Sequence, residues 1–230
     1  MKSLISILLA TVCLVPGCSK MANPGPMQSE ADVPSTPTEE KYSAIVTVKQ
    51  DAAGTIFFQL DDETRIYPDN YTEPYKGMCR IICGIILYGN RCTVLWMDYL
   101  EEGNMPDEWG GAVEAPDPGS GFKDDGLDIL DDWMTSVEDG FLTVHYSTWW
   151  GEGNTPHSFR LLKNELKPNE LTLQHSRNGE EPVRKADALV YFDINSFFPP
   201  TAGDYVSITL NWTTSEGNPA SKIFRFRSRQ

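Results

Sequence analysis

The chain has 230 residues, of which 40% are hydrophobic and 11% aromatic, and its formal net charge is −14 at pH 7. This composition is typical of a globular protein with room for one large or two small domains. The excess of negative charge disfavours nucleic acid and anionic membrane surfaces as partners, because both would repel the chain.

The N-terminus has the pattern of a signal peptide over residues 1–17. Lys2 precedes an apolar run from Leu4 to Val15, which is too short to span a bilayer but suits the apolar region of a secretory signal. The run ends at Gly17 and Cys18. This ending resembles a bacterial lipobox, which implies a lipidated Cys18 that anchors the chain to the outer membrane, on a face that the sequence does not reveal. The alternative is an ordinary secretion signal with an incidental cysteine.

Residues 18–41 are polar and rich in proline, which predicts a disordered tether. From Tyr42 onward, short alternating runs separated by turn residues indicate strands. Five such strands fall within residues 42–100, with no helical pattern between them, and they predict a five-stranded OB-like β-barrel. The expected strands cover residues 44–49, 55–60, 64–67, 77–88 and 91–99.

Three cysteines lie in the last two of these strands, which should form a hairpin around Gly89-Asn90. The expected register places Leu87 opposite Cys92 and Trp96 opposite Cys83. Cysteines four residues apart along a strand are about 13 Å apart, beyond the reach of a disulfide. We therefore expect Cys79, Cys83 and Cys92 to be reduced and mostly buried.

Residues 101–123 are acidic and rich in proline and glycine, which predicts a linker. Seven further short strands follow within residues 124–228, and their spacing is typical of a two-sheet β-sandwich. The expected strands are Leu127–Val137, Phe141–Trp149, His157–Leu162, Leu171–His175, Ala188–Ile194, Tyr205–Trp212 and Ile223–Phe226.

In this arrangement the chain resembles the NigD-like lipoproteins, over about residues 42–228. The resemblance rests on the lipobox, the tether, the strand Lys76–Ile82, and sandwich motifs that include Leu127-Asp128-Ile129, Asp139–Val144, Pro156–Leu162 and Val190–Ile194. It implies an OB-type first domain, a β-sandwich second domain and an association with bacteriocin biology. It implies neither an enzymatic activity nor a cofactor.

The sequence has no motif of a phosphate-binding loop, zinc protease or serine hydrolase. His145, His157 and His175 all lie in expected strands of the sandwich. A hairpin over residues 141–163 would place His145 opposite Arg160, so we expect separate histidines and no metal site. The acidic residues of 124–132 lack the order of an EF-hand; a solvated face is the stronger interpretation, and a weak calcium site stays open.

The tryptophans are the remaining candidates for binding. Trp96, Trp133 and Trp212 lie in expected strands and should pack in the cores, whereas Trp109 lies in the linker. Trp149 and Trp150 stand at the tip of the expected hairpin, where one should face the core and the other the solvent. Exposed tryptophans can stack on sugars or anchor a protein partner; a cap over the sandwich end is the equal alternative.

Taken together, the sequence predicts a non-catalytic outer-membrane lipoprotein that acts as an extracytoplasmic binding module. Its membrane attachment should come from the lipid alone, and its partner should be an unidentified protein or glycan. The alternative is a glycan-binding lipoprotein that uses Trp149, Trp150 and Trp109, with a glycosidase as a third possibility.

Overall fold

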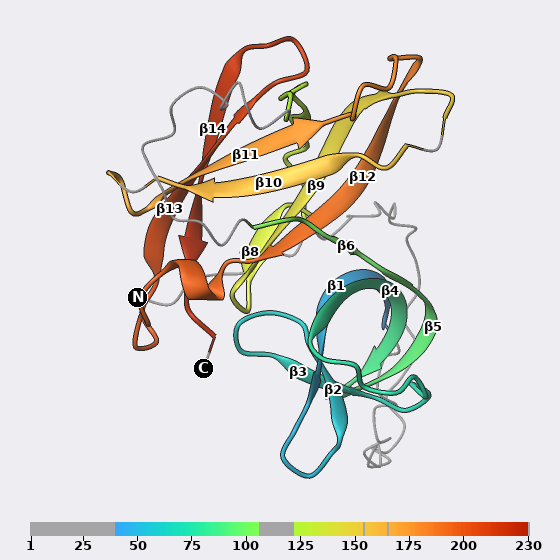
Figure 1. The fold of residues 1–230 in the computed structure, drawn as a ribbon. Helices are drawn as coiled ribbons and strands as arrows, with labels where there is room; N and C mark the ends of the chain where they lie inside the picture. The colour runs from blue at the N-terminus through green and yellow to red at the C-terminus, as the bar shows by residue number, and fades with distance from the viewer. Residues whose placement is uncertain (1–39, 106–121, 154, 165, 230) are drawn as a thin grey trace, which may run out of the picture. The chain divides into compact units, whose positions relative to one another are not determined.

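The structure, a computed structural model, describes residues 40–105, 122–153, 155–164 and 166–229. These residues form β-strands and one short 3-10 helix, η1 (Asn195–Phe197), and they confirm the predicted all-β fold (Figure 1). Cys18 and Trp109 lie outside the described residues. No described helix is long and apolar enough to span a membrane.

The first five strands close into a barrel in the order β1-β2-β3-β5-β4. Only β3 and β5 pair in parallel within it. A closed five-stranded barrel of this kind is the OB-type architecture, as predicted. The strands are β1 (Glu40–Gln50), β2 (Ile56–Gln59), β3 (Arg65–Pro68), β4 (Cys79–Tyr88) and β5 (Arg91–Tyr99).

A bulge in β5 changes the predicted register of the hairpin. Leu87 lies opposite Cys92 as expected, but Trp96 lies opposite Gly84 rather than Cys83, because Leu95 is an extra residue in β5. The Trp96 indole lies so close to Gly84 that a Cβ there would overlap it. Trp96 is therefore 47% exposed on the barrel surface and does not pack in the core.

The cysteines are free thiols, as the register predicts. Cys83 and Cys92 are buried and Cys79 is half-buried. All three contribute to the barrel core, which is otherwise made of aliphatic and aromatic side chains that alternate with outward-facing ones along each strand.

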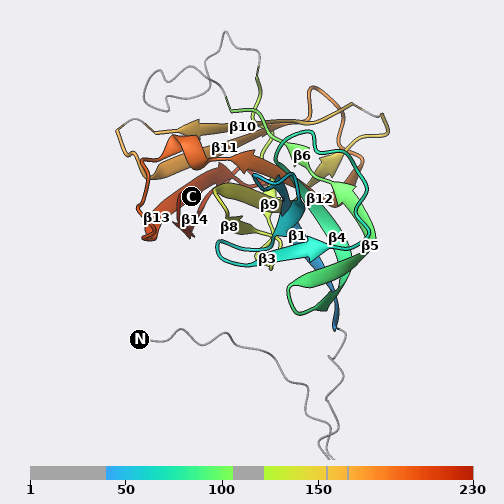
Figure 2. The same cartoon turned by 90° about the horizontal axis from the view of Figure 1, so that it is seen from below.

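Two sheets form the sandwich (Figures 1 and 2). One has the order β10-β11-β13-β14 and the other β6-β12-β9-β7, with β8 also paired to β9. The bounds are β6 (Glu101–Glu102), β7 (Asp128–Ile129), β8 (Ser136–Glu138), β9 (Phe141–Trp150), β10 (Ser158–Lys163), β11 (Glu170–Ser176), β12 (Arg184–Asp193), β13 (Val206–Thr213) and β14 (Pro219–Phe226).

The sandwich has more strands than the seven predicted. The strand expected over 127–137 is divided into β7 and β8 by a turn that contains Trp133, and β6 adds a strand from the predicted linker. Because it lies in that turn, Trp133 is 56% exposed rather than in the core.

The predicted hairpin over residues 141–163 is wrong. β9 pairs with β12, and β10 pairs with β11 in the other sheet. His145 therefore lies opposite Leu189 and not Arg160. The residues after Trp150 cross from one sheet to the other, as connections in β-sandwiches commonly do.

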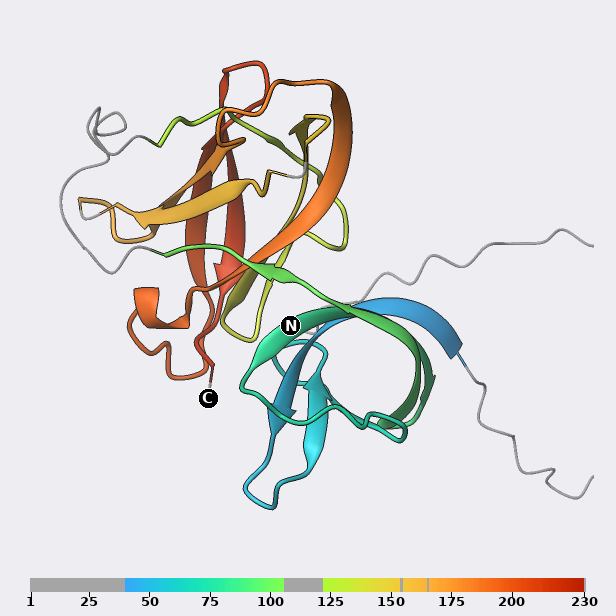
Figure 3. The same ribbon diagram turned by 45° about the vertical axis from the view of Figure 1, so that its right-hand side comes forward.

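Several contacts join the barrel to the sandwich. The chain leaves β5 and pairs in parallel with β12 as β6 (Figure 3). Arg80 on β4 is fully buried, contacts Glu138 at 3.5 Å and lies over the ring of Phe141. The residues from 40 onward form one compact unit. The predicted linker 101–123 thus begins with residues paired to the sandwich; the domain boundaries at 42–100 and 124–228 stay a prediction.

Candidate functional site

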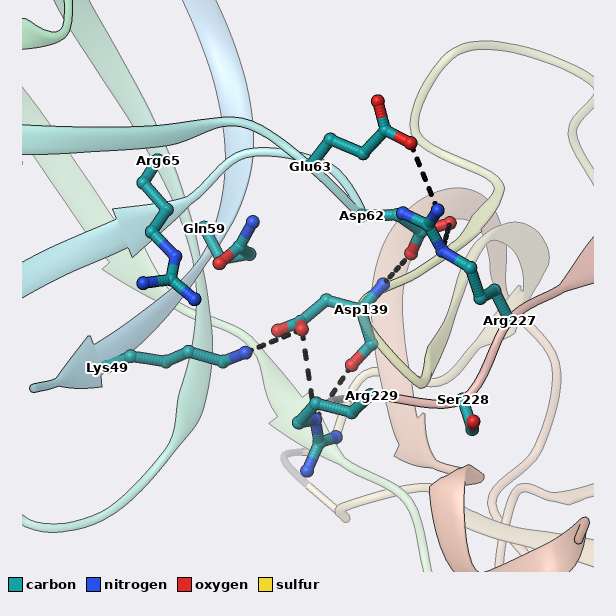
Figure 4. Close-up of a pocket in the computed structure, with 9 residues that line it drawn as sticks. All are labelled: Lys49, Gln59, Asp62, Glu63, Arg65, Asp139, Arg227, Ser228 and Arg229. Atoms are coloured by element: carbon teal, nitrogen blue, oxygen red, sulfur yellow. Dashed lines mark hydrogen bonds and ion pairs between the residues drawn. The ribbon is translucent and has the colours of Figure 1, made fainter. Parts of the chain in front are cut away.

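A cavity of about 300 Å³ lies where the barrel meets the sandwich (Figure 4). From the barrel it is lined by Lys49, Gln59 and Arg65 on the first three strands and by the loop residues Asp62 and Glu63. From the sandwich it is lined by Asp139, Arg227, Ser228 and Arg229. We call this cavity the junction pocket.

The alternation of the strands explains the barrel side of the junction pocket. Gln59 pairs with Arg65, and Lys49 pairs with Phe57, so these four side chains share the outer face of the barrel. Their sequence neighbours, such as Val48 and Phe58, point into the barrel core. Three polar side chains from separate strands are thereby brought together on one surface.

A tight turn brings Asp139 to the opposite side. Asp139 and Gly140 connect β8 to β9 and both have positive φ, at 52° and 75°. This is the conformation of a two-residue hairpin turn, for which Asp-Gly is a preferred sequence. The backbone N–H of Asp139 donates to a carboxylate oxygen of Asp62 at 2.6 Å, which fixes the turn against the barrel.

The Asp139 side chain is 7% exposed, and only one of its two carboxylate oxygens forms a hydrogen bond with a described residue. Its Oδ1 accepts a hydrogen bond from the Lys49 ammonium at 2.6 Å. Its Oδ2 is buried and has no hydrogen-bond partner among the described residues. Burial lowers the pKa of Lys49, and the hydrogen bond to Asp139 offsets part of this effect.

The arginines of the junction pocket differ in how they are paired. Arg227 forms an ion pair with Glu63 at 3.0 Å, and Arg229 forms one with Asp193 at 3.0 Å. Arg65 lies over the ring of Phe57, 4.9 Å from its centroid, and forms no ion pair with any described residue. The pocket thus gathers four basic side chains against three acidic ones, in a chain of net charge −14.

This set of side chains is suited to binding an anionic group. Arginine and lysine are the usual ligands of carboxylate and phosphate groups. Among the described lining residues there is no histidine or cysteine, and the hydroxyl of Ser228 is hydrogen-bonded to Thr201.

The predicted tryptophan pair does not line the junction pocket. Trp149 is 42% exposed, whereas Trp150 packs against the sandwich core, as the alternation predicts. The Trp150 ring stacks on His157 at 4.0 Å and its Nε1–H donates to the carbonyl oxygen of Ala186 at 3.2 Å. Trp109, the third predicted binding residue, lies outside the described residues.

Two of the three histidines meet, contrary to the expectation that they are separate. His157 Nδ1 and His175 Nε2 are 3.0 Å apart, because β10 and β11 are neighbours. His145 lies elsewhere, between Asp132 and Asp187. Within the described ranges, no group of three or more His, Cys, Asp or Glu side chains could hold a metal ion.

The acidic residues of 124–132 do not form a common site; each has its own partner. Asp125 pairs with Arg177, Asp128 with Lys185 and Asp131 with Lys222. Asp132 contacts His145, and Asp124 accepts from the backbone N–H of His175. These carboxylates hold the strands of the sandwich together.

Sequence reasoning did not find the junction pocket. Its residues come from positions 49–65, 139 and 227–229, which have no common local pattern. The one available signal is the run of Arg225, Arg227 and Arg229 at alternating positions near the end of an acidic chain.

Known proteins share this fold. Residues 114–226 match the family model of the NigD-like C-terminal beta sandwich domain. No curated protein matches the sequence at a significant level.

Three solved structures from species of Parabacteroides and Bacteroides are similar over most of their length. A "putative toxin related protein" from Parabacteroides distasonis has a TM-score of 0.65 and 21% identity, over 82% of this chain and 94% of its own. A NigD-like immunity protein from Bacteroides caccae has a TM-score of 0.53 and 18% identity, over 79% and 91%. A "putative lipoprotein" from Bacteroides fragilis has a TM-score of 0.52 and 12% identity, over 83% and 99%.

At these identities the structural likeness shows a common fold. The family match over the sandwich agrees with the motifs found in the sequence. Residues 114–226 of the chain therefore belong to the family of NigD-like C-terminal β-sandwich domains.

Proposed function

We propose that this chain is a non-catalytic, lipid-anchored binding protein that holds a negatively charged group of an extracytoplasmic partner in the junction pocket. The observation that carries this proposal is Arg65. It is a cation without an ion pair among the described residues, beside Lys49 and Arg229 in the same pocket. Positive charge collected in a concave site of an acidic chain favours an anionic ligand.

The anchor and the location follow from the sequence and from one structural relative. The lipobox ending at Cys18 supports lipidation, and the "putative lipoprotein" of Bacteroides fragilis has the same fold. The location we propose is the outer membrane.

Two other relatives support a polypeptide as the partner. The Bacteroides caccae relative is described as an immunity protein and the Parabacteroides distasonis relative as toxin related. We therefore favour a secreted peptide or protein that this chain would capture near the membrane, as in protection against a bacteriocin.

The test is capture from envelope extract by the detergent-solubilised protein. Arg65→Gln should lose the captured partner. Arg184→Gln is the matched control, because it removes one exposed strand arginine outside the pocket and changes the net charge equally. Equal capture by both variants and the parent would contradict a role for the pocket.

Glycan binding is the second candidate function. It is favoured by the exposure of Trp149, whose ring is available for stacking on a sugar. In that case Trp149→Ala should abolish capture of a glycan while Arg65→Gln leaves it unchanged.

A further inference from the structure

The junction pocket holds two unsatisfied groups of opposite character. Asp139 Oδ2 is a buried acceptor without a partner, and the Arg65 guanidinium is a donor without an ion pair among the described residues. Figure 4 shows the Arg65 and Lys49 side chains reaching toward the Asp139 carboxylate from the barrel side. A buried unpaired carboxylate oxygen is costly, so a ligand that donates to it would bind favourably.

A simple anion would satisfy only one of these groups. Phosphate or sulfate would pair with Arg65 but would be repelled by the Asp139 carboxylate. A simple cation would pair with the Asp139 carboxylate but would be repelled by Arg65. The pocket is complementary to a ligand that has an anionic acceptor for Arg65 and, next to it, a hydrogen-bond donor for Asp139.

A second cavity, of about 370 Å³, adjoins this arrangement and shares Lys49, Arg65 and Arg229 with it. Its lining also includes Phe57, Tyr75 and Met78. We call it the rim groove. Met78 is an exposed, flexible apolar side chain that can adapt to another apolar group. An apolar surface thus lies beside the cationic one.

From these features we propose that the junction pocket and the rim groove together bind the C-terminus of a polypeptide that ends in an apolar residue. The terminal carboxylate pairs with Arg65, the last peptide N–H donates to Asp139 Oδ2, and the last side chain occupies the rim groove. Capture of a terminal carboxylate is a known mode of peptide recognition. The inference rests on the function proposed above and specifies its ligand.

The pocket is less suited to an acidic sugar. Sugars bind by stacking on an open aromatic face, but the Phe57 ring is buried and has Arg65 over it. The peptide terminus makes use of all three features, namely the Arg65 guanidinium, the Asp139 Oδ2 acceptor and the apolar rim.

The test uses the detergent-solubilised protein and fluorescently labelled tripeptides with the sequence Ala-Ala-Leu, measured by fluorescence anisotropy. The free acid should bind, and its C-terminal amide should bind at least tenfold more weakly. Arg65→Gln should weaken binding of the acid at least tenfold, whereas Arg184→Gln should leave it unchanged.

Asp139 is tested with a tripeptide in which an ester oxygen replaces the last peptide N–H. The parent protein should bind this ester at least fivefold more weakly than the amide-linked acid. Asp139→Asn should lose this preference for the amide-linked acid, because Lys49 holds Oδ1 and the Asn amide would present a donor in place of Oδ2. Asn also tolerates the positive φ of this turn.

The possible outcomes separate this inference from the proposed function. If glucuronate or inorganic phosphate competes as well as the tripeptide, and does so through Arg65, the C-terminus assignment is overturned and the anion pocket stands. If the tripeptide acid and its amide bind equally, the assignment is also overturned. If no probe binds and Arg65→Gln captures the same partners as the parent, both proposals fail.

Discussion

At the scale of single residues, His175 makes folding sensitive to acid. It is fully buried, and its ring nitrogens contact the Gly126 carbonyl oxygen at 2.9 Å and His157 at 3.0 Å. Burial lowers the pKa of His175 from 6.5 to about 4. The unfolded chain therefore takes up a proton below about pH 6.5 that the folded protein does not accept until about pH 4.

The stability that depends on neutral His175 should be fully present above pH 6.5 and should decrease as the pH falls toward 4, by about 3 kcal/mol in all. Urea unfolding at pH 7.5, 6 and 5 measures this loss. The control is His175→Gln, which should show a smaller dependence on pH. A variant whose stability changes in parallel with the parent would show that other groups cause the effect.

Trp149 and Trp150 should differ sharply in their contribution to stability. Trp150 packs against the sandwich core and stacks on His157, so Trp150→Ala should cost about 3–5 kcal/mol. Trp149 is exposed, and Trp149→Ala should change stability by less than about 0.5 kcal/mol. Chemical unfolding of both variants tests this difference, and equal losses would contradict it.

At the scale of elements, the strands of the barrel were predictable because each can be recognised within a short stretch of sequence. Each of its five strands lies between turn residues, and each expected strand overlaps an observed one. The bulge at Leu95 was not predictable, because it depends on the contact between Trp96 and Gly84 on the neighbouring strand.

The sandwich was predictable only in part. Its strands were visible as alternating runs, but their partners were not, because β9 joins β12 across about forty residues rather than the adjacent β10. The junction pocket depends on these long-range pairings and on the packing of the Asp139 turn against Asp62. A pattern within one strand cannot contain that information.

The thiols of β4 and β5 should react in an order set by their burial. Burial raises the pKa of Cys83 to about 12 and that of Cys92 to about 11, and also raises the pKa of the half-buried Cys79. A thiol-specific reagent at pH 8 should modify Cys79 first and the other two only on unfolding. After denaturation without reductant, all three should titrate as free. Finding only one free thiol would show that two of these cysteines form a disulfide, contrary to the prediction.

At the scale of the whole molecule, membrane attachment should depend on one residue. In the proposed lipoprotein, acyl chains on Cys18 would be the only strong membrane-binding feature that the sequence offers, since the chain is acidic. Cys18→Ser should therefore move the protein from the membrane pellet to the soluble fraction. A variant that stays in the pellet after a high-salt wash would contradict lipid anchoring.

The barrel and the sandwich should unfold together. Arg80 is fully buried beside Glu138, and Lys49 pairs with the nearly buried Asp139, so these two cations of the barrel have their partners on the sandwich. Separating the two parts would break both ion pairs, remove the Phe141 ring from Arg80 and expose the apolar surface between them to water. It would also remove the pairing of β6 with β12.

We therefore expect the chain to melt in a single transition, and fragments 40–100 and 122–229 to melt well below it. Calorimetry of the chain and of each fragment provides the measurement. In the intact chain, Arg80→Met combined with Glu138→Gln should be less destabilising than Arg80→Met alone, because the double variant leaves no unpaired charge. Fragments that melt at the temperature of the parent would show two independent domains, with the junction pocket formed only by their docking.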